Sequence, residues 1–338
     1  MRFHKADKPK AVDGTAFHWC FIGTGTLANC VAKSILPSGG HTIAAAYTRR
    51  FEKCLAFSNK YGATPYRSAR DAICAPGVDA VYIVTPHNSH YEYAKLALSL
   101  GKPVLCEKPF AVTAKQAEEL IALAAESHLY IAEAMWTWFA PVANKIKAWL
   151  DNGEFGEVKS VLACYHWKIR KHHSRHTNPD TAGGALLDIG IYPITYLYRL
   201  FGCPVKTVCT GELKDGIDLC EDVAMTFENG QTYTATSSIK DSRGSEKLII
   251  KGSDAKITVR VFRAANAVRL IRKNKKNERF SGNGWYLNEF DIVASEIREG
   301  LMESRFVPHG STLDVMRIID DCRHQLGLIY PFEASSDI

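Results

Sequence analysis

The stretch Trp19-Cys20-Phe21-Ile22-Gly23-Thr24-Gly25-Thr26-Leu27-Ala28 decides the fold of this chain. An apolar strand leads directly into a loop of the pattern G-x-G-x-x-(G/A), and an apolar helical segment follows. In such a loop Gly23 permits the tight turn, Gly25 lets the backbone approach a pyrophosphate, and Ala28 allows the helix to pack closely on the sheet. The helix N-terminus then faces anionic oxygens. An ordinary strand-to-helix turn can carry the same pattern, so the neighbouring segments decide between the two interpretations.

Around this loop, short apolar runs alternate with amphipathic stretches up to about residue 140. The expected strands are Phe17–Ile22, Thr42–Tyr47, Ala80–Val84, Val104–Cys106 and Tyr130–Ala134, and the expected helices are Leu27–Leu36, Phe51–Tyr61, Tyr91–Leu100 and Ala114–Ser127. This alternation predicts right-handed βαβ units around a mostly parallel sheet. We therefore predict a doubly wound α/β (Rossmann) domain over residues 1–140. The residues expected to bind a dinucleotide there are Gly23, Thr24, Gly25, Thr26 and Leu27.

The pattern changes from Val158 onward to longer runs of alternating residues separated by polar, glycine-containing turns. The expected strands are Lys159–Trp167, Thr207–Gly211, Val223–Phe227, Thr232–Ser238, Lys247–Lys251, Ile257–Phe262 and Ala267–Ile271. Two helical segments, Leu287–Gly300 and Ser311–Leu326, follow them. These features predict an α+β domain with a large, mostly antiparallel open sheet over residues 141–338.

Composition limits the partners and the compartment. The chain has 338 residues, 46% of them hydrophobic, and a net charge of +6 that is spread along it. The basic run around Lys273-Asn274-Lys275-Lys276 has no interleaved aromatic residues, so we expect a solvated hairpin or loop and no nucleic-acid partner. No stretch reaches the roughly 18 apolar residues of a membrane span, and the N-terminus lacks a signal-peptide core, which predicts a cytoplasmic protein without a membrane partner. Ten cysteines without a Cys-x-x-Cys pair are expected to be reduced and buried.

The end of the second expected strand, Ala46-Tyr47-Thr48-Arg49-Arg50, predicts which dinucleotide binds. A carboxylate there would bond the 2′-hydroxyl of the ribose, but the segment carries none and Glu52 comes late. Arg49 and Arg50 can instead pair with a 2′-phosphate. We therefore predict that NADP(H) is preferred over NAD(H) and that Thr48, Arg49 and Arg50 bind it. The alternative is that both arginines lie on a solvated helix start.

Five motifs occur in a fixed order along the chain. They are the glycine loop, Thr48-Arg49-Arg50, Val84-Thr85-Pro86-His87-Asn88-Ser89-His90, Cys106-Glu107-Lys108-Pro109, and Ala182-Gly183-Gly184-Ala185-Leu186-Leu187-Asp188-Ile189-Gly190-Ile191-Tyr192-Pro193. Together they resemble the glucose-fructose oxidoreductase/inositol dehydrogenase (Gfo/Idh/MocA) family from about Phe17 to Pro331. The last motif, with Glu133-Ala134-Met135-Trp136, is most similar to the branch of dimeric dihydrodiol dehydrogenase and NADP-dependent D-xylose dehydrogenase.

The resemblance implies hydride transfer between a nicotinamide and a hydroxyl or carbonyl carbon of a sugar, polyol or cyclic trans-diol. Asp188 and Tyr192 are four residues apart in a segment that reads as helix from Gly184 to Phe201, so one face presents both, with a kink at Pro193. Tyr192 would donate and accept the proton, and Asp188 would orient it or relay protons. Lys108 would favour the phenolate and bind the substrate oxygen. Without the motif, Tyr192 reads as a core aromatic.

Further contacts are implied by the same resemblance. The residues expected at the cofactor include Thr85, Pro86, His87, His90, Glu107, Lys108 and Trp136, and those expected at the substrate are Lys108, Trp136, Arg175, Asp188 and Tyr192. His87 is equally compatible with a solvated position, and Arg175 with support of its own loop. The peptide bond before Pro109 is expected to be cis.

Two alternatives to this site remain open. The histidines His166, His172, His173 and His176 suggest a metal, but they lack metal-ligand spacing, so we expect a solvated loop and no metal; contact of His172 or His173 with substrate stays open. A catalytically weak NAD(P)-sensing regulatory protein is the alternative function, although such a protein is expected to lose the lysine and the acid-base residue. We also expect a homodimer or homotetramer formed through the exposed face of the C-terminal sheet.

Overall fold

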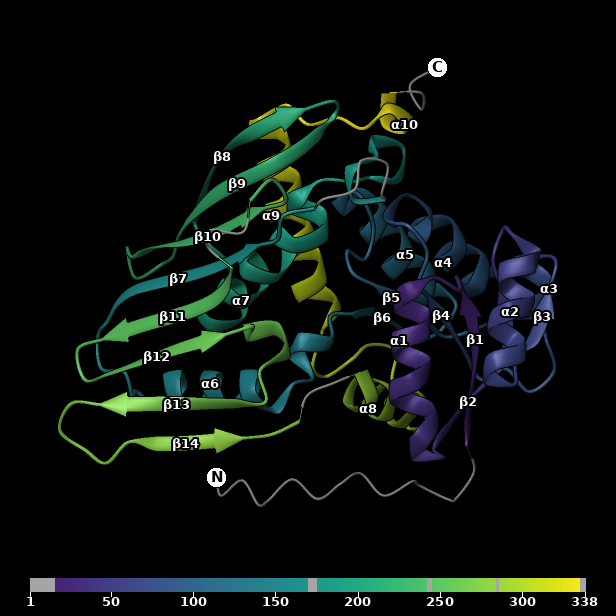
Figure 1. Ribbon diagram of the computed structural model, residues 1–338, viewed down its shortest axis with the longest axis horizontal. Helices are drawn as coiled ribbons and strands as arrows, with labels where there is room; N and C mark the ends of the chain where they lie inside the picture. The colour runs from purple at the N-terminus through teal and green to yellow at the C-terminus, as the bar shows by residue number, and fades with distance from the viewer. Residues whose placement is uncertain (1–15, 170–174, 242–244, 284–285, 335–338) are drawn as a thin grey trace.

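The computed structural model describes residues 16–169, 175–241, 245–283 and 286–334. These residues form two sheets that lie side by side, each packed against helices (Figure 1). Among the described residues, no helix is both long and apolar enough to cross a bilayer.

The first sheet is parallel and has the strand order β3-β2-β1-β4-β5-β6. Its strands are β1 (Phe17–Ile22), β2 (His41–Tyr47), β3 (Thr64–Tyr66), β4 (Ala80–Ile83), β5 (Val104–Glu107) and β6 (Ile131–Ala134), and its helices are α1 (Thr26–Ile35), α2 (Phe51–Tyr61), α3 (Ala69–Ile73), α4 (His90–Ser99) and α5 (Ala114–Glu126). The strand order reverses between β1 and β4, and ligands of such sheets bind at the carboxyl ends of the strands at this point. The predicted Rossmann fold is confirmed. Sequence analysis missed β3 and α3, which are too short to produce a recognisable period.

The second sheet has eight strands in the order β14-β13-β12-β11-β7-β10-β9-β8. They are β7 (Val158–His166), β8 (Lys206–Lys214), β9 (Ile217–Thr226), β10 (Thr232–Ser238), β11 (Glu246–Gly252), β12 (Ala255–Arg260), β13 (Ala267–Arg272) and β14 (Glu278–Ser281). Only β7 and β10 pair in parallel, so the mostly antiparallel prediction is confirmed. The basic run predicted as a hairpin or loop connects β13 to β14, a strand that sequence analysis missed.

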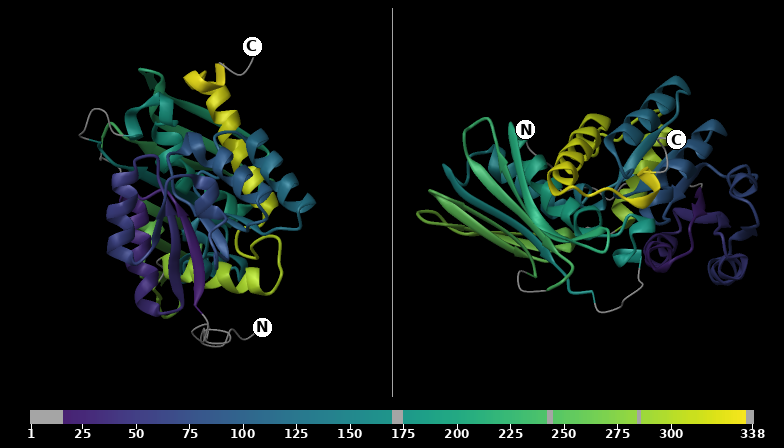
Figure 2. Two further views of the ribbon diagram at one scale, coloured as in Figure 1. Left: turned by 90° about the vertical axis from the view of Figure 1, so that its right-hand side faces the viewer. Right: turned by 90° about the horizontal axis from the view of Figure 1, so that it is seen from above.

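Helices cover one face of this second sheet. They are α6 (Pro141–Asp151), α7 (Ile191–Phe201) and α9 (His309–Leu326). Figure 2 shows the curved sheet with these helices on its inner side and, in the described part of the chain, no helix on its outer side. Alternating burial along β12 follows from this arrangement, because inward residues such as Ile257 are buried and outward residues such as Lys256 are exposed.

A helix from the end of the chain returns to the first sheet. The helix α8 (Tyr286–Arg298) lies beside α1 (Figure 1). Its fully buried Phe290 packs edge to face on Trp19 at 4.7 Å and on Tyr82 at 5.0 Å between ring centroids. Removing such a ring costs about 3–5 kcal/mol. The C-terminal segment thus completes the first core, and the boundary expected between residues 140 and 141 stays a prediction.

The cysteines only partly match the prediction. All ten are free thiols, as expected, and most are buried. The expectation of burial was wrong for Cys30, Cys74 and Cys203, which are exposed. Cys30 shows the reason, since it lies on the solvent side of α1, whose buried residues are Ala28, Val31, Ala32 and Ile35.

Candidate active site

The glycine loop is shaped for a pyrophosphate. Gly23 has a φ of 110°, and a Cβ added there would lie 2.5 Å from the carbonyl oxygen of Val84, so only glycine fits between β1 and β4. A Cβ on Gly25 would meet nothing within 4 Å, which leaves open space before α1. Gly25 caps α1 without a side-chain hydrogen bond, so the N–H groups of Thr26 and Leu27 in the first turn can face an anion. The residues present fit a dinucleotide.

Cations gather where β2 ends. Thr48 is half-buried, while Arg49 and Arg50 are exposed just before α2, and neither arginine has an ion-pair partner among the described residues. Sequence analysis missed Arg67, whose guanidinium carbon lies 3.8 Å from the centroid of the Phe51 ring. Arg67 follows β3, and because that strand was not recognised, its position next to α2 could not be predicted.

His87 is buried, so the solvated alternative was wrong. Its Nδ1 lies 3.1 Å from the carbonyl oxygen of Ala182, and its Nε2 lies 3.3 Å from Nη1 of Arg175. Nδ1–H can donate to the carbonyl while Nε2 accepts from the arginine, which requires the neutral ring. Burial, followed by the charge of Arg175, holds the pKa of His87 well below its usual value.

His90 joins two loops of the site. Its Nδ1 is 2.8 Å from the carbonyl oxygen of Pro109, and its Nε2 is 3.0 Å from that of Thr85. Burial lowers the pKa of His90 to about 4. The bond between Lys108 and Pro109 is cis, as expected.

Glu107 lies beneath this turn and is buried. Tyr82 donates a hydrogen bond of 2.6 Å to Glu107 Oε1, and burial raises the pKa of Glu107. The expected cofactor contacts of Thr85, Pro86, His90 and Glu107 stay predictions.

The glycine-rich segment before α7 forms a π-helical turn from Leu186 to Gly190 rather than the regular helix that we expected from Gly184. Asp218 explains why a glycine precedes this turn, because a Cβ on Gly184 would collide with Asp218 Oδ1. Asp218 also fixes the first residue of the turn, since the Leu186 N–H donates to Asp218 Oδ2 at 2.6 Å. In a π-helix each N–H bonds the carbonyl five residues earlier. Pro193 lies beyond this turn, on α7, and has no N–H to give to a carbonyl of the turn.

Lys108 donates to this turn from outside the helix. Its Nζ lies 2.6 Å from the carbonyl oxygen of Asp188 and 3.3 Å from Asp188 Oδ1. Three more groups surround the same carboxylate: Nη2 of Arg175 at 3.4 Å, Nε2 of His87 at 3.7 Å, and Nδ1 of His176 at 2.6 Å from Oδ2. Burial alone would raise the pKa of Asp188, but Lys108, then His176 and Arg175, outweigh burial and hold it well below its usual value. Asp188 is therefore ionised. We call this carboxylate and the four side chains around it, Lys108, His87, Arg175 and His176, the Asp188 hub.

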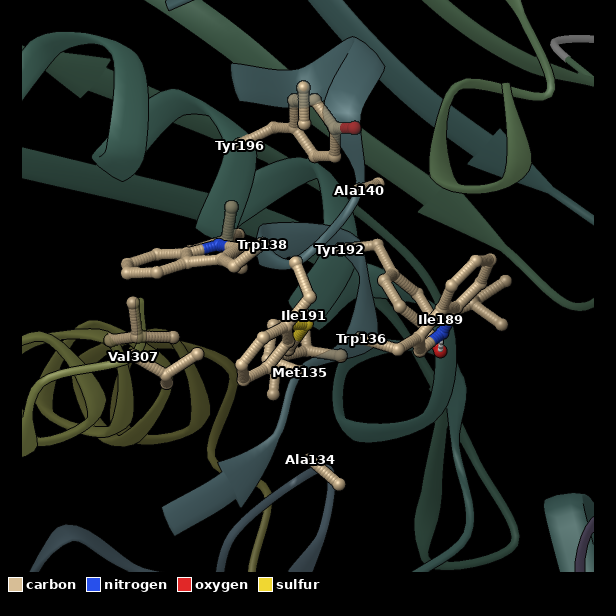
Figure 3. Packing of buried hydrophobic residues seen from close by; sticks show 14 of the residues in the cluster. Ala134, Met135, Trp136, Trp138, Ala140, Ile189, Ile191, Tyr192, Tyr196 and Val307 are labelled. Atoms are coloured by element: carbon tan, nitrogen blue, oxygen red, sulfur yellow. Dashed lines mark hydrogen bonds between the residues drawn. The ribbon is translucent and has the colours of Figure 1, made fainter. Parts of the chain in front are cut away.

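Tyr192 completes the cluster. Its hydroxyl accepts a hydrogen bond of 3.1 Å from Nε1 of Trp136 (Figure 3). Lys108 Nζ lies 5.0 Å from the centroid of the Tyr192 ring. Burial raises the pKa of Tyr192, and Arg263 is the strongest opposing charge. The phenol is consequently protonated at neutral pH. Lys108 donates its described hydrogen bonds to Asp188, and its expected effect on the phenolate stays a prediction.

Sequence analysis missed His176 and Arg263 at the site. His176 was expected in a solvated loop, but its side chain is 17% exposed and bonds Asp188. Arg263 follows β12, and its guanidinium carbon lies 5.6 Å from the ring centroid of Tyr192. No sequence signal marks either residue, since tertiary packing alone brings them to Asp188 and Tyr192. His172 and His173 lie outside the described residues, and within the described ranges no group of three or more His, Cys, Asp or Glu could hold a metal.

Comparison with known proteins places this geometry in a family. The model of an oxidoreductase family with an NAD-binding Rossmann fold (GFO/IDH/MocA) matches residues 17–134, and the model of a C-terminal domain of the same family matches residues 143–258. Relatives include trans-1,2-dihydrobenzene-1,2-diol dehydrogenase of Mus musculus, 28% identical over 94% of this chain and 98% of that protein. Another is the NADP(+)-dependent D-xylose 1-dehydrogenase of Hypocrea jecorina, 27% identical over 95% and 94%.

A similar solved structure is the 3-ketoreductase KijD10 of Actinomadura kijaniata in complex with NADP and TDP-benzene. It matches with a TM-score of 0.83 and 23% identity, covering 92% of this chain and 98% of that one, which supports the fold. Two family models thus cover the first sheet and most strands of the second, and sequence relatives extend over nearly the whole chain. The chain therefore belongs to the Gfo/Idh/MocA family of oxidoreductases and carries that family's NAD(P)-binding Rossmann domain.

Proposed function

We propose that this protein is an NADP(H)-dependent oxidoreductase that transfers a hydride between the nicotinamide and a hydroxyl or carbonyl carbon of a sugar, polyol or cyclic trans-diol. The substrates named for its relatives support this class. The observation that carries the proposal is the convergence of Lys108, which follows β5, with Asp188 and Tyr192 of the π-turn and α7. Lys108 Nζ contacts Asp188 and lies 5.0 Å from the centroid of the Tyr192 ring. The bound nicotinamide supplies or takes up the hydride.

The chain's own residues divide the remaining work. The protonated phenol of Tyr192 gives its proton to the oxygen of a carbonyl substrate, or takes it from a hydroxyl in the reverse direction. Lys108 has three N–H groups, and two of them face Asp188 at 2.6 and 3.3 Å. The third is left for the substrate oxygen. Asp188 pairs with the buried Lys108 side chain and orients it.

Trp136 and Arg175 are the further side chains proposed to contact the substrate. Trp136 bonds the Tyr192 hydroxyl and so lies against the substrate. The Arg175 side chain contacts Asp188 and His87 and is 43% exposed. It therefore supports its own loop and presents N–H groups on the solvent side of the site. The regulatory alternative is not favoured, because a protein that only senses the cofactor has no use for a buried lysine and phenol held together.

NADP(H) is the preferred cofactor in this proposal. Arg49 and Arg50 are exposed at the end of β2, next to Thr48, and Arg67 lies against the first residue of α2. A 2′-phosphate can take charge-assisted hydrogen bonds from these guanidinium groups. The only acidic residue in the first turn of α2, Glu52, is exposed and comes after the arginines.

The outer face of the second sheet is the proposed oligomer interface. It carries large apolar side chains, Leu162 on the central strand β7 and Val208 on the edge strand β8, that are 38% and 43% exposed. Its far end is strongly basic, with Lys256, Arg260 and Arg269 pointing outward. Two copies would therefore meet over β7, β10, β9 and β8, away from the basic strands β12 and β13. Sedimentation of the purified protein tests this, and a monomer at all concentrations would contradict it.

Turnover measurements test the proposed activity. Absorbance of the reduced nicotinamide is followed with NADP(H) and NAD(H) against a panel of aldoses, inositols and trans-dihydrodiols. We expect turnover with at least one class, preference for NADP(H), and loss of turnover in Lys108→Met. Tight cofactor binding without turnover of any of these substrates would contradict the proposal and favour a sensor.

A further inference from the structure

Arg263 is held rigidly against the helix that carries Tyr192. It lies in a short 3-10 turn, Phe262 to Ala264, after Val261, whose φ of 51° is left-handed. Phe262 is buried and packs edge to face on Tyr196 at 4.7 Å, and the Tyr196 hydroxyl donates to the Phe262 carbonyl at 3.0 Å. Tyr196 lies one helical turn after Tyr192 on α7. The position of Arg263 relative to the phenol is therefore fixed by packing.

The guanidinium itself is anchored on its other side. Arg263 Nε donates to Glu246 Oε2 at 3.0 Å, and its backbone N–H donates to Glu246 Oε1 at 2.8 Å. Its guanidinium carbon lies 4.6 Å from the ring centroid of Tyr165 and 5.6 Å from that of Tyr192. A guanidinium over aromatic rings at these distances makes a cation–π contact.

Tyr192 is faced by charged and titratable groups from several elements. Lys108 and Glu107 come from the end of β5, Asp188 from the π-turn, and Arg263 from the turn after β12. The phenols of Tyr165 on β7 and Tyr286 on α8 lie nearby. Each of the two cations has a carboxylate partner, Asp188 for Lys108 and Glu246 for Arg263. Arg263 is the cation that acts most strongly against the burial of the phenol, which otherwise raises the pKa of Tyr192.

We propose that Arg263 is a positioning residue that stabilises the negative charge left on the Tyr192 oxygen when its proton leaves, while Lys108 serves the substrate oxygen. This inference rests on the proposed acid-base role of Tyr192. In reduction the carbonyl carbon gains a hydride as the nicotinamide is oxidised. The carbonyl oxygen takes the proton of Tyr192, and the electron pair of the broken O–H bond stays on Tyr192 until water reprotonates it.

The test is the pH dependence of kcat for oxidation of the best alcohol substrate, in which Tyr192 must first lose its proton. Arg263→Gln should displace the profile to higher pH by about one unit, which lowers kcat about tenfold on its acid side. Arg263→Lys keeps the charge and should restore most of the difference. Arg269→Gln, which removes an exposed arginine on β13, is the control and should leave the profile unchanged. Superimposable profiles for Arg263→Gln and the wild type would overturn the inference.

A second variant separates charge from structure. Glu246→Gln keeps Arg263 and an acceptor for its Nε but removes the carboxylate charge, so the profile should move to lower pH, opposite to that of Arg263→Gln. A merely structural role predicts losses of kcat in both variants without opposite displacements, and that result would also overturn the inference. Cofactor binding, followed by nicotinamide fluorescence, should remain unchanged in both.

The Tyr192→Phe variant distinguishes an error in the proposed role of Tyr192 from an error in the inference about Arg263. Near-normal turnover in Tyr192→Phe means that the proposed role of Tyr192 is wrong. An inactive Tyr192→Phe combined with an unshifted Arg263→Gln profile means that only the inference about Arg263 is wrong.

Discussion

The glycine loop and the Asp188 hub are built on opposite principles. The loop is one continuous stretch between β1 and α1, and it works through backbone N–H groups and the absence of side chains at Gly23 and Gly25. The hub gathers side chains from β5, the 84–90 loop, the 175–177 turn and the π-turn around one buried carboxylate. The pyrophosphate site is therefore a local property of the chain, whereas the proposed chemistry depends on long-range packing of charges.

The largest effect should come from removing the amine of the hub. Lys108→Met should lower kcat by about 10²–10⁴-fold, in the range of general acid-base groups, because substrate oxygen and Asp188 both lose their cation. Cofactor affinity should be kept, since the glycine loop is unaffected. Lys115→Met on the exposed surface of α5 is the matched control. Steady-state kinetics and cofactor fluorescence measure both, and a joint loss of kcat and cofactor affinity would contradict the separation of the two regions.

Stability against pH should depend on Glu133, which lies beneath the Lys108 turn. It accepts hydrogen bonds from the Phe110 N–H at 3.2 Å and from the Thr312 hydroxyl at 3.4 Å, and burial raises its pKa to about 7. The folded protein then binds a proton more tightly than the unfolded chain, so stability falls as pH rises from about 4.5 to about 7. The loss is on the order of 3 kcal/mol.

Glu133→Gln should remove this dependence, because the amide cannot ionise and still offers an acceptor to Phe110. Urea unfolding at several pH values measures the free energy of unfolding. A variant that keeps the full pH slope between pH 5 and 7 would show that the slope comes from other groups, such as Glu107 and Glu289.

Two glycine substitutions sharpen the comparison within the loop itself. Gly23→Ala should lower the free energy of unfolding by about 1–3 kcal/mol, because its backbone is left-handed and its Cβ meets Val84. Gly25→Ala has no such conflict, so stability should be retained while NADP(H) affinity falls. Thermal unfolding and cofactor titration on the same samples measure the two effects. Equal losses of stability in both variants would mean that Gly25 has a structural rather than a binding role.

The smallest effect should come from substitutions where the adenosine end of the cofactor is expected to bind. Arg49→Ala should weaken NADP(H) binding about tenfold, since one charge-assisted contact of roughly 1.5 kcal/mol is lost, and should leave NAD(H) binding unchanged. Glu52→Ala, on the first turn of α2, is the control. Equal weakening of both cofactors would contradict a 2′-phosphate site.

The contrast between the two regions also explains what could be predicted from the sequence. The strand, glycine loop and helix were predicted because each is encoded by neighbouring residues, and Lys108, Asp188 and Tyr192 were found through motifs in a known order. The π-turn was not predicted, because a register change leaves the apolar spacing of Leu186 to Gly190 almost unaltered. His176 and Arg263 were missed for another reason: their contacts with Asp188 and Tyr192 exist only after folding.

Comparing kcat of Lys108→Met, Tyr192→Phe and the double variant tests most directly whether the amine and the phenol act on one substrate carbon. Groups that act as a unit give losses that do not multiply. We predict that the double variant is about as slow as the slower single variant. Losses that multiply, or turnover close to that of the wild type in either single variant, would contradict the account.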